Sequence, residues 1–170
     1  MKKPRPLLYN LHRLIARCAS LTPTGIDRID FQHARFLLEL AQKEGRIIQF
    51  MRQQGSVAFP VSRSLAQTII HNLEQRWQQG KALEPAVRFG ITDIIKRWPV
   101  SVWQEKRKKL IRPQIRQNLV NTSKPPIYLH SGHGTLQHVG LHQQIKKNLQ
   151  ADSIYYLHDL IPINLSLIHI

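Results

Sequence analysis

Two short stretches of this chain carry side chains suited to phosphate or acid–base chemistry. The first, residues 22–30 (TPTGIDRID), places hydroxyls, a glycine and an arginine at the start of an amphipathic segment. Thr22 or Thr24 can cap a helix there, and the first-turn N–H groups together with the helix dipole attract an anion, phosphate above all. Gly25 lets the backbone approach a ligand closely. A capped turn without any ligand explains the same residues.

The second stretch lies near the C-terminal end, where small and acid–base residues follow two apolar segments. Residues 126–130 and 153–157 predict strands, followed by Gly132 and His133 in one case and by His158 and Asp159 in the other. Ligands bind at the carboxyl ends of strands in open α/β sheets. His158 and Asp159 suit a general-base pair, and a structural histidine is the alternative. No HExxH-like spacing is present, so no metal site is expected.

The elements that must position these residues alternate between helix and strand. Apolar positions in residues 25–43 follow a helical period: Ile26, Ile29, Ala34, Leu37, Leu38 and Ala41, flanked by Phe36 and Leu40. Helices are also predicted at 65–79 and 136–149, strands at 6–10, 46–51 and 56–61, and a basic loop or short helix at 11–19. A turn at 53–55 makes the second and third strands a hairpin. This alternation predicts an α/β fold with a mostly parallel sheet flanked by helices.

Composition limits the function classes. The chain of 170 residues is long enough for one domain with a core, and 25 Lys+Arg against 10 Asp+Glu predicts a polyanionic partner. Cys18 is the only cysteine, which excludes an internal disulfide and a thiolate metal cluster and suits a reducing cytoplasm. We expect Cys18 to pack as a small apolar residue. No apolar run approaches the ~20 residues that span a bilayer.

Much of the positive charge falls in residues 81–124, which hold 11 Lys+Arg against 3 Asp+Glu. Tryptophans between basic residues suit an anionic lipid surface and also a nucleic-acid groove. The absence of a zinc finger, an RNP motif or a helix-turn-helix pattern weakens the nucleic-acid interpretation. A solvated basic linker is the third possibility. The candidate membrane or polyanion surface comprises Lys96, Arg97, Trp98, Trp103, Lys106, Arg107, Lys108, Lys109 and Arg112.

Three ordered motifs resemble a known family. They are LLYN leading to TPTGIDR (residues 7–10 and 22–28), IYLHSGH (127–133) and YLHDLIP (156–162). Together they are similar to the N-terminal half of retaining glycosyltransferases of the GT-B fold, in particular the family 4 sugar-nucleotide-dependent transferases of bacterial polysaccharide assembly. The resemblance covers residues 7–163. TPTGIDR and HDLIP are specific as a pair and weak singly.

The resemblance implies a fold and roles for individual residues. The fold is the Rossmann-like N-terminal half of a GT-B enzyme, and the nucleotide-diphosphate sugar is a substrate, so no cofactor is expected. Gly25 matches the turn glycine near the donor pyrophosphate and the acceptor, and His158 matches the catalytic histidine beside the reacting sugar. The cleft residues are then Thr24, Gly25, Ile26, Arg28, Gly132, His133 and Asp159.

The departures from the family are equally specific. In a GT-B enzyme a second Rossmann-like domain holds the nucleotide, and nothing in this chain corresponds to it. We expect residues 1–164 to form the acceptor-side domain with a basic insertion at 81–124. Residues 165–170 (LSLIHI) resemble a translated sequencing adapter, with a native apolar tail strand as the alternative.

These features predict a fragment that is inactive alone. Its expected partners are the missing C-terminal domain, a nucleotide-sugar donor, a glycan or lipid-linked acceptor and an anionic membrane surface; nucleic acid is not expected. The expected location is the cytoplasm, with peripheral attachment to the inner face of the plasma membrane. A basic nucleic-acid-binding module and a non-catalytic α/β interaction domain remain as alternatives.

Overall fold

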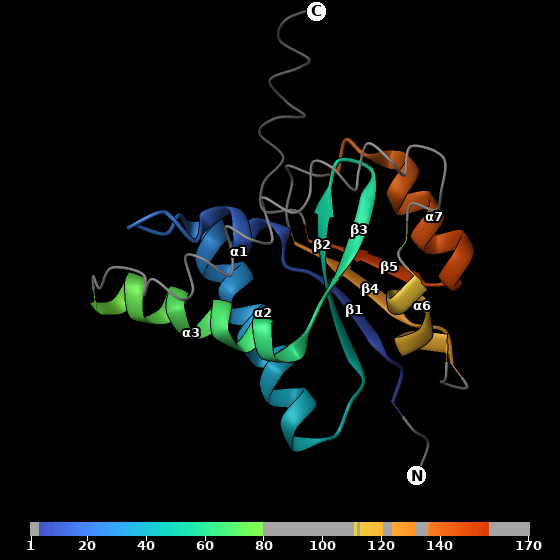
Figure 1. Ribbon diagram of the computed structural model, residues 1–170, viewed down its shortest axis with the longest axis horizontal. Coiled ribbons are helices and arrows are strands. Elements are labelled where there is room, and N and C mark those ends of the chain that lie inside the picture. Colours follow the sequence, from blue (N-terminus) through green and yellow to red (C-terminus); the bar gives the residue numbers. More distant parts are fainter. Residues whose placement is uncertain (1–3, 80–110, 112, 121–123, 132–135, 157–170) are drawn as a thin grey trace, which may run out of the picture.

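The computed structural model describes residues 4–79, 111, 113–120, 124–131 and 136–156, and the remaining residues are left undescribed. Helices α1, α2 and α3 lie on one side of a central sheet, and α6 and α7 on the other (Figure 1). The helices are α1 (His12–Arg17), α2 (Gly25–Lys43), α3 (Arg63–Gln79), α6 (Pro113–Val120) and α7 (Val139–Leu149). The strands are β1 (Leu7–Asn10), β2 (Ile48–Gln54), β3 (Val57–Val61), β4 (Ile127–His130) and β5 (Asp152–Tyr155).

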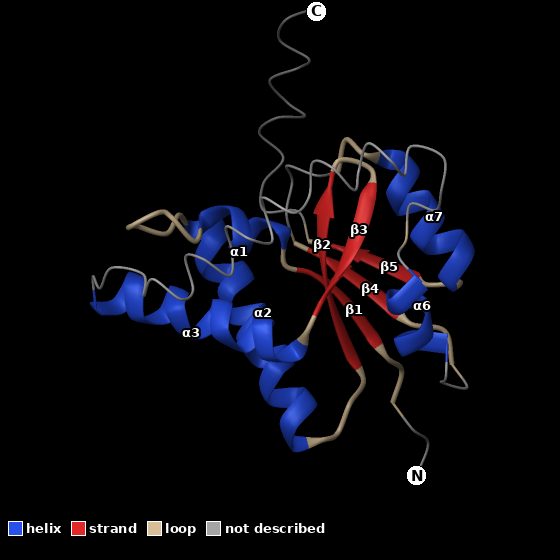
Figure 2. Cartoon of the chain, viewed as in Figure 1, coloured by secondary structure: helices blue, strands red, loops and turns tan. Residues whose placement is uncertain are grey.

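The sheet has five strands in the order β3-β2-β1-β4-β5 (Figure 2). β1 is parallel to β2 on one side and to β4 on the other, and β5 is parallel to β4. Only β3 is antiparallel, as the hairpin partner of β2. The expected α/β fold with a mostly parallel, helix-flanked sheet is confirmed.

Alternation along the central strand divides the core into two layers. Leu7 and Tyr9 face α1, α2 and α3, whereas Leu8 faces α6 and α7. The first layer also takes in Cys18, as expected, and burial raises the pKa of its thiol to about 12. Because helices cover both faces, the central strand β1 carries buried apolar side chains on both sides, as parallel strands generally do.

Helix α2 begins and ends where the sequence predicts, but it presents a different face to the core. Its buried residues are Asp27, Asp30, Phe31, Ala34, Leu37, Leu38 and Ala41. Ile29 is 37% exposed and Phe36 is 60% exposed. Counting only apolar residues therefore misplaced the first turns, because two aspartates and not Ile29 continue the 3.6-residue period of the buried face.

Other boundaries shift by a few residues. The strand expected at 46–51 is β2, which extends to Gln54, so the turn centres on Gly55 with a positive φ of 53°. The helix expected from residue 136 begins at Val139. Helix α6 was not predicted; Pro113 stands in its first turn, where the missing N–H costs no hydrogen bond.

Helix α6 also revises the interpretation of residues 81–124. Its side chains Ile115 and Leu119, with Ile111 just before it, belong to the second core layer. This end of the basic segment is therefore part of the fold and not a solvated linker. Residues 96–110 and Arg112, which carry the candidate polyanion surface, lie outside the described residues. Among the described helices, none combines the length and apolarity that crossing a bilayer requires.

Replacing Ile115 with alanine tests this packing. Ile115 is fully buried, so Ile115→Ala should lower the free energy of unfolding by about 2–5 kcal/mol. Exposed Arg116, its neighbour on the same helix, is the matched control, and Arg116→Ala should change that energy by less than about 0.5 kcal/mol. Urea denaturation measures both. Equal, small effects would show that α6 does not belong to the core.

Candidate functional site

The chain reverses its direction of travel across the sheet at β1. From β1 it proceeds through α1 and α2 to β2 on one side, and later returns to place β4 on the other side. In open α/β sheets such a switch point leaves a crevice outside the carboxyl ends of the two strands, where ligands bind. Here β1 ends at Asn10 and β4 at His130, and the carboxyl ends of these strands point toward the upper edge of the sheet in Figure 2.

A buried carboxyl group connects three elements at this edge. The hydroxyls of Tyr9 and Ser131 both donate to Oδ1 of Asp30. The two hydroxyl oxygens are 3.1 Å apart, and the Tyr9 hydroxyl also lies 3.2 Å from the main-chain oxygen of Asp30. We call these three residues the Asp30 cluster. It joins the second turn of α2 to the end of β1 and to the residue after β4.

The Asp30 cluster is electrostatically costly. Asp30 is 0% exposed, and its Oδ2 has no hydrogen-bond partner within the described ranges. Burial raises the pKa of Asp30 despite the two hydroxyl donors, and burial followed by the charge of Asp30 raises the pKa of Tyr9 well above its usual value. Hydrogen bonds to a charged group return about 1.5–3 kcal/mol each, and burying a carboxylate costs several kcal/mol. The two terms are of similar size, so the cluster adds little net stability.

A second polar group lies on the other face of the sheet at the same edge. The side-chain nitrogen of Asn10 is 3.2 Å from Oε1 of Gln53 and 3.2 Å from Nδ1 of His130. The His130 ring packs against His142 of α7 and against Tyr155 of β5, with ring centroids 5.2 and 6.0 Å apart. Both faces of the switch point are thus lined with polar and aromatic side chains.

Two basic side chains reach this edge from β2 and α1. Arg52 is only 9% exposed, and burial lowers the pKa of its guanidinium to about 10, so it remains a cation at neutral pH. His12, half-buried, follows β1, and burial together with the nearby charge of Arg52 lowers its pKa. A fixed cation and a histidine held neutral suit an anionic ligand.

The N-terminus of α2 is closed by its own side chains. Thr24 accepts a hydrogen bond from the N–H of Asp27, and Asp27 accepts one from the N–H of Thr24, which makes a capping box. Nε of Arg13 and Nε of Arg17 lie 2.8 and 3.0 Å from the two oxygens of Asp27. Burial raises the pKa of Asp27, but the Thr24 hydrogen bonds and the two arginines outweigh it and leave that pKa lowered.

Of the residues expected at the site, the structure describes those of the TPTGIDR motif. Thr24 is the helix cap, Gly25 and Arg28 are exposed, and Ile26 is half-buried. A Cβ added to Gly25 would have no atom within 4 Å, so open space lies over this turn. The other expected residues, Gly132, His133, His158 and Asp159, lie outside the described residues.

Described residues close to these four positions in sequence lie at one edge of the sheet, beside α2. Ser131, which precedes Gly132, contacts Asp30. Tyr156, two residues before His158, donates its N–H to the carbonyl of His130 at 2.9 Å, and its ring lies 5.6 Å from that of His33 on α2. Residues of the second and third motifs therefore contact the first half of α2, the helix that begins within the first motif.

Sequence reasoning missed the side chains that make these contacts. The sequence places Tyr9 and His130 in predicted strands and Asp30 at the end of the stretch 22–30, and it assigns none of them a contact. One signal was available: Asp27 and Asp30 are three residues apart and in phase with Ala34, which places them on the buried face of the helix. A buried acid on a helix in a chain this basic indicates a specific partner.

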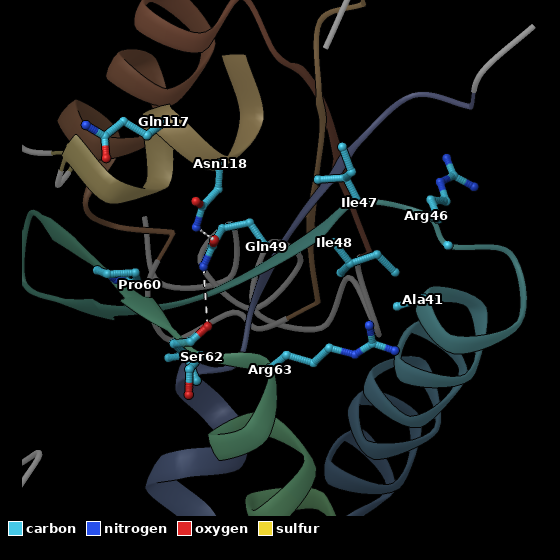
Figure 3. A pocket seen from close by; sticks show the side chains of 12 residues that line it. Ala41, Arg46, Ile47, Ile48, Gln49, Pro60, Ser62, Arg63, Gln117 and Asn118 are labelled. Atoms are coloured by element: carbon cyan, nitrogen blue, oxygen red, sulfur yellow. Dashed lines mark hydrogen bonds between the residues drawn. The ribbon is translucent and has the colours of Figure 1, made fainter. Parts of the chain in front are cut away.

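A hollow lies at the opposite edge of the sheet. It has a volume of about 800 Å³ and is bordered by the end of α2, the start of β2, the end of β3 and the α6 residues Gln117 and Asn118 (Figure 3). Arg63 extends across it, while Gln49 and Asn118 bond to each other at 2.6 Å. Two of its three amide side chains are thus paired with each other. The hollow also lies at the amino end of β2, so we place the site at the switch point instead.

The chain was also compared with known proteins. No protein-family model, no curated protein and no solved structure matches it. Among the described residues, no group of three or more histidine, cysteine, aspartate or glutamate side chains is arranged to hold a metal ion. A functional conclusion therefore depends on the geometry and on the motifs alone.

Asp27 gives a pH-dependent prediction. Because its pKa is lower in the folded chain than the usual 3.8, its stabilising effect should be complete above that value and lost as the pH falls through the folded pKa. Asp27→Asn should lower the free energy of unfolding by about 2 kcal/mol at pH 7 and by much less in acid.

Asp152 provides the matched control, because its 2.6 Å pair with Arg5 is exposed to solvent. Asp152→Asn should cost less than about 1 kcal/mol. Urea denaturation of both variants between pH 2 and 7 measures the difference. A deficit for Asp27→Asn that stays constant over this range would contradict the assigned ion pairs.

Proposed function

We propose that this chain is the acceptor-side, N-terminal domain of a retaining glycosyltransferase with the GT-B fold. In this proposal the complete protein transfers a sugar from a nucleotide-diphosphate donor to a glycan or lipid-linked acceptor. The chain supplies one wall of the cleft, and a second α/β domain supplies the nucleotide-binding wall. Charge agrees with this assignment, since a chain with formal net charge +15 favours a pyrophosphate-bearing ligand.

One observation carries the proposal. Described residues that belong to the three family-like motifs or directly follow them, among them Asp30, Ser131 and Tyr156, lie together at the carboxyl ends of β1, β4 and β5, where an α/β sheet binds its ligands. The motifs are far apart in sequence, so the sheet order alone brings their flanks together. A non-catalytic interaction domain gives no reason for the residues of these motifs to lie together at the switch point of the sheet.

The first turn of α2 suits the role of anion site. The capping box occupies the N–H groups of Thr24 and Asp27, and the N–H of Arg28 donates to the carbonyl of Thr24. The N–H groups of Gly25 and Ile26 stand outside that set and carry the positive end of the helix dipole. They would stabilise the departing diphosphate electrostatically, while His158 would orient the transferred sugar.

Turnover tests the proposal directly. The purified 170-residue chain should release no nucleoside diphosphate from any nucleotide sugar. The natural reading frame that contains these residues should encode a second α/β domain with a pair of glutamates eight residues apart, and its product should release nucleoside diphosphate. Turnover by the 170-residue chain alone, or a longer frame without such a domain, would contradict the assignment.

Membrane attachment is a separate prediction about the basic segment. Each Lys or Arg near an anionic bilayer contributes about 1 kcal/mol, so Lys108→Gln with Lys109→Gln should weaken binding to phosphatidylserine vesicles about tenfold or more. Two consecutive exposed lysines of α7, Lys146 and Lys147, form the matched control. Lys146→Gln with Lys147→Gln should leave vesicle binding nearly unchanged. Vesicle sedimentation measures both pairs. Tighter, salt-dependent binding to nucleic acid than to these vesicles would favour the nucleic-acid-binding alternative.

A further inference from the structure

The Asp30 cluster contains an acid that the proposed chemistry does not use. Asp30 is fully buried, so no substrate touches it, and its Oδ2 is without a hydrogen-bond partner among the described residues. Its Oδ1 instead accepts hydrogen bonds from the hydroxyls of Tyr9 and Ser131, which lie far apart in the sequence. Such an arrangement adds little net stability, which favours a role in setting geometry.

The cluster has the right connections for that role. Asp30 stands one turn and a half beyond the capped N-terminus of α2, on the face that packs against the sheet. Tyr9 belongs to the central strand, paired on both sides, and is 0% exposed, so its hydroxyl is a fixed point. Ser131 is the residue at which the chain leaves β4. Holding both hydroxyls to one oxygen therefore fixes α2 relative to the end of β4.

We propose that Asp30 is a positioning residue, which sets the separation between the first turn of α2 and the end of β4. These two segments flank the switch point, so Asp30 fixes the width of the cleft in the proposed transferase, and in that respect the inference rests on the proposed function. Only an oxygen acceptor at Oδ1 is needed. The raised pKa of Asp30 agrees with this, because a neutral side chain of the same shape meets the requirement.

Distances between spin labels test the proposal without any substrate. Gly25→Cys places one label on the first turn of α2, where a side chain has open space. Ile154→Cys places the other on β5, which is hydrogen-bonded to β4, at a side chain 51% exposed. The native Cys18 is 3% exposed with a thiol pKa of about 12, so it should remain unlabelled.

The variants separate positioning from stability. Asp30→Ala should broaden or shift the distance distribution, whereas Asp30→Asn, which keeps the acceptor oxygen, should restore the narrow distribution of the parent chain. Ala34→Gly is the control, since it destabilises the same buried face one turn further along α2 and removes no donor or acceptor of the cluster, and it should leave the distribution unchanged. If Asp30→Ala does not fold, Ser131→Ala removes one donor and should broaden the distribution partly.

Two results would overturn the proposal. One is a distribution in Asp30→Ala, or in Ser131→Ala where the former does not fold, that matches the parent chain. The other is equal broadening in Ala34→Gly, which would assign the effect to general loss of stability. Neither result depends on turnover, so failure of the positioning role and failure of the transferase assignment are distinguishable.

Discussion

The hydrogen bonds from Tyr9 and Ser131 to the carboxyl group of Asp30 connect the three segments that form the candidate site. It crosses from the helix after the first strand to the central strand and to the end of the strand that enters on the other side. A buried acid costs several kcal/mol unless it is well bonded, so the three side chains must stay together whenever the domain is folded. The first turn of α2 and the exits of β4 and β5 then share one edge.

Helix α2 is unusual in using acids as part of its packing face. Asp27 closes the helix N-terminus and binds two arginines of α1, and Asp30, one turn later, binds the two hydroxyls. The chain has only 10 acids against 25 basic residues, and two of these acids are fully buried on this helix. The arrangement pairs Arg13 and Arg17 with Asp27, while the exposed side chain of Arg28 and the N–H groups of Gly25 and Ile26 lie outside these bonds.

Elements defined by strong local patterns could be predicted from the sequence, including the bounds of α2, the β2–β3 hairpin and the helix–strand alternation. Their sheet order could not, because pairing β1 with both β2 and β4 depends on packing between distant segments. Helix α6 was missed because a short apolar period inside a basic stretch resembles a linker. The expectation of a site at the strand ends stays a prediction, and the contacts of Asp30 with Tyr9 and Ser131 could not be predicted, because they join distant segments through polar side chains.

A structure of the proposed two-domain transferase with a nucleoside diphosphate bound would test the central claim, that the ligand binds at the carboxyl edge of the sheet. The account predicts that the domain described here meets the ligand beyond the ends of β1 and β4, with a phosphate within hydrogen-bond distance of the N–H groups of Gly25 and Ile26. A diphosphate held instead in the hollow beside Arg63, or bound without contact to α2, would contradict it.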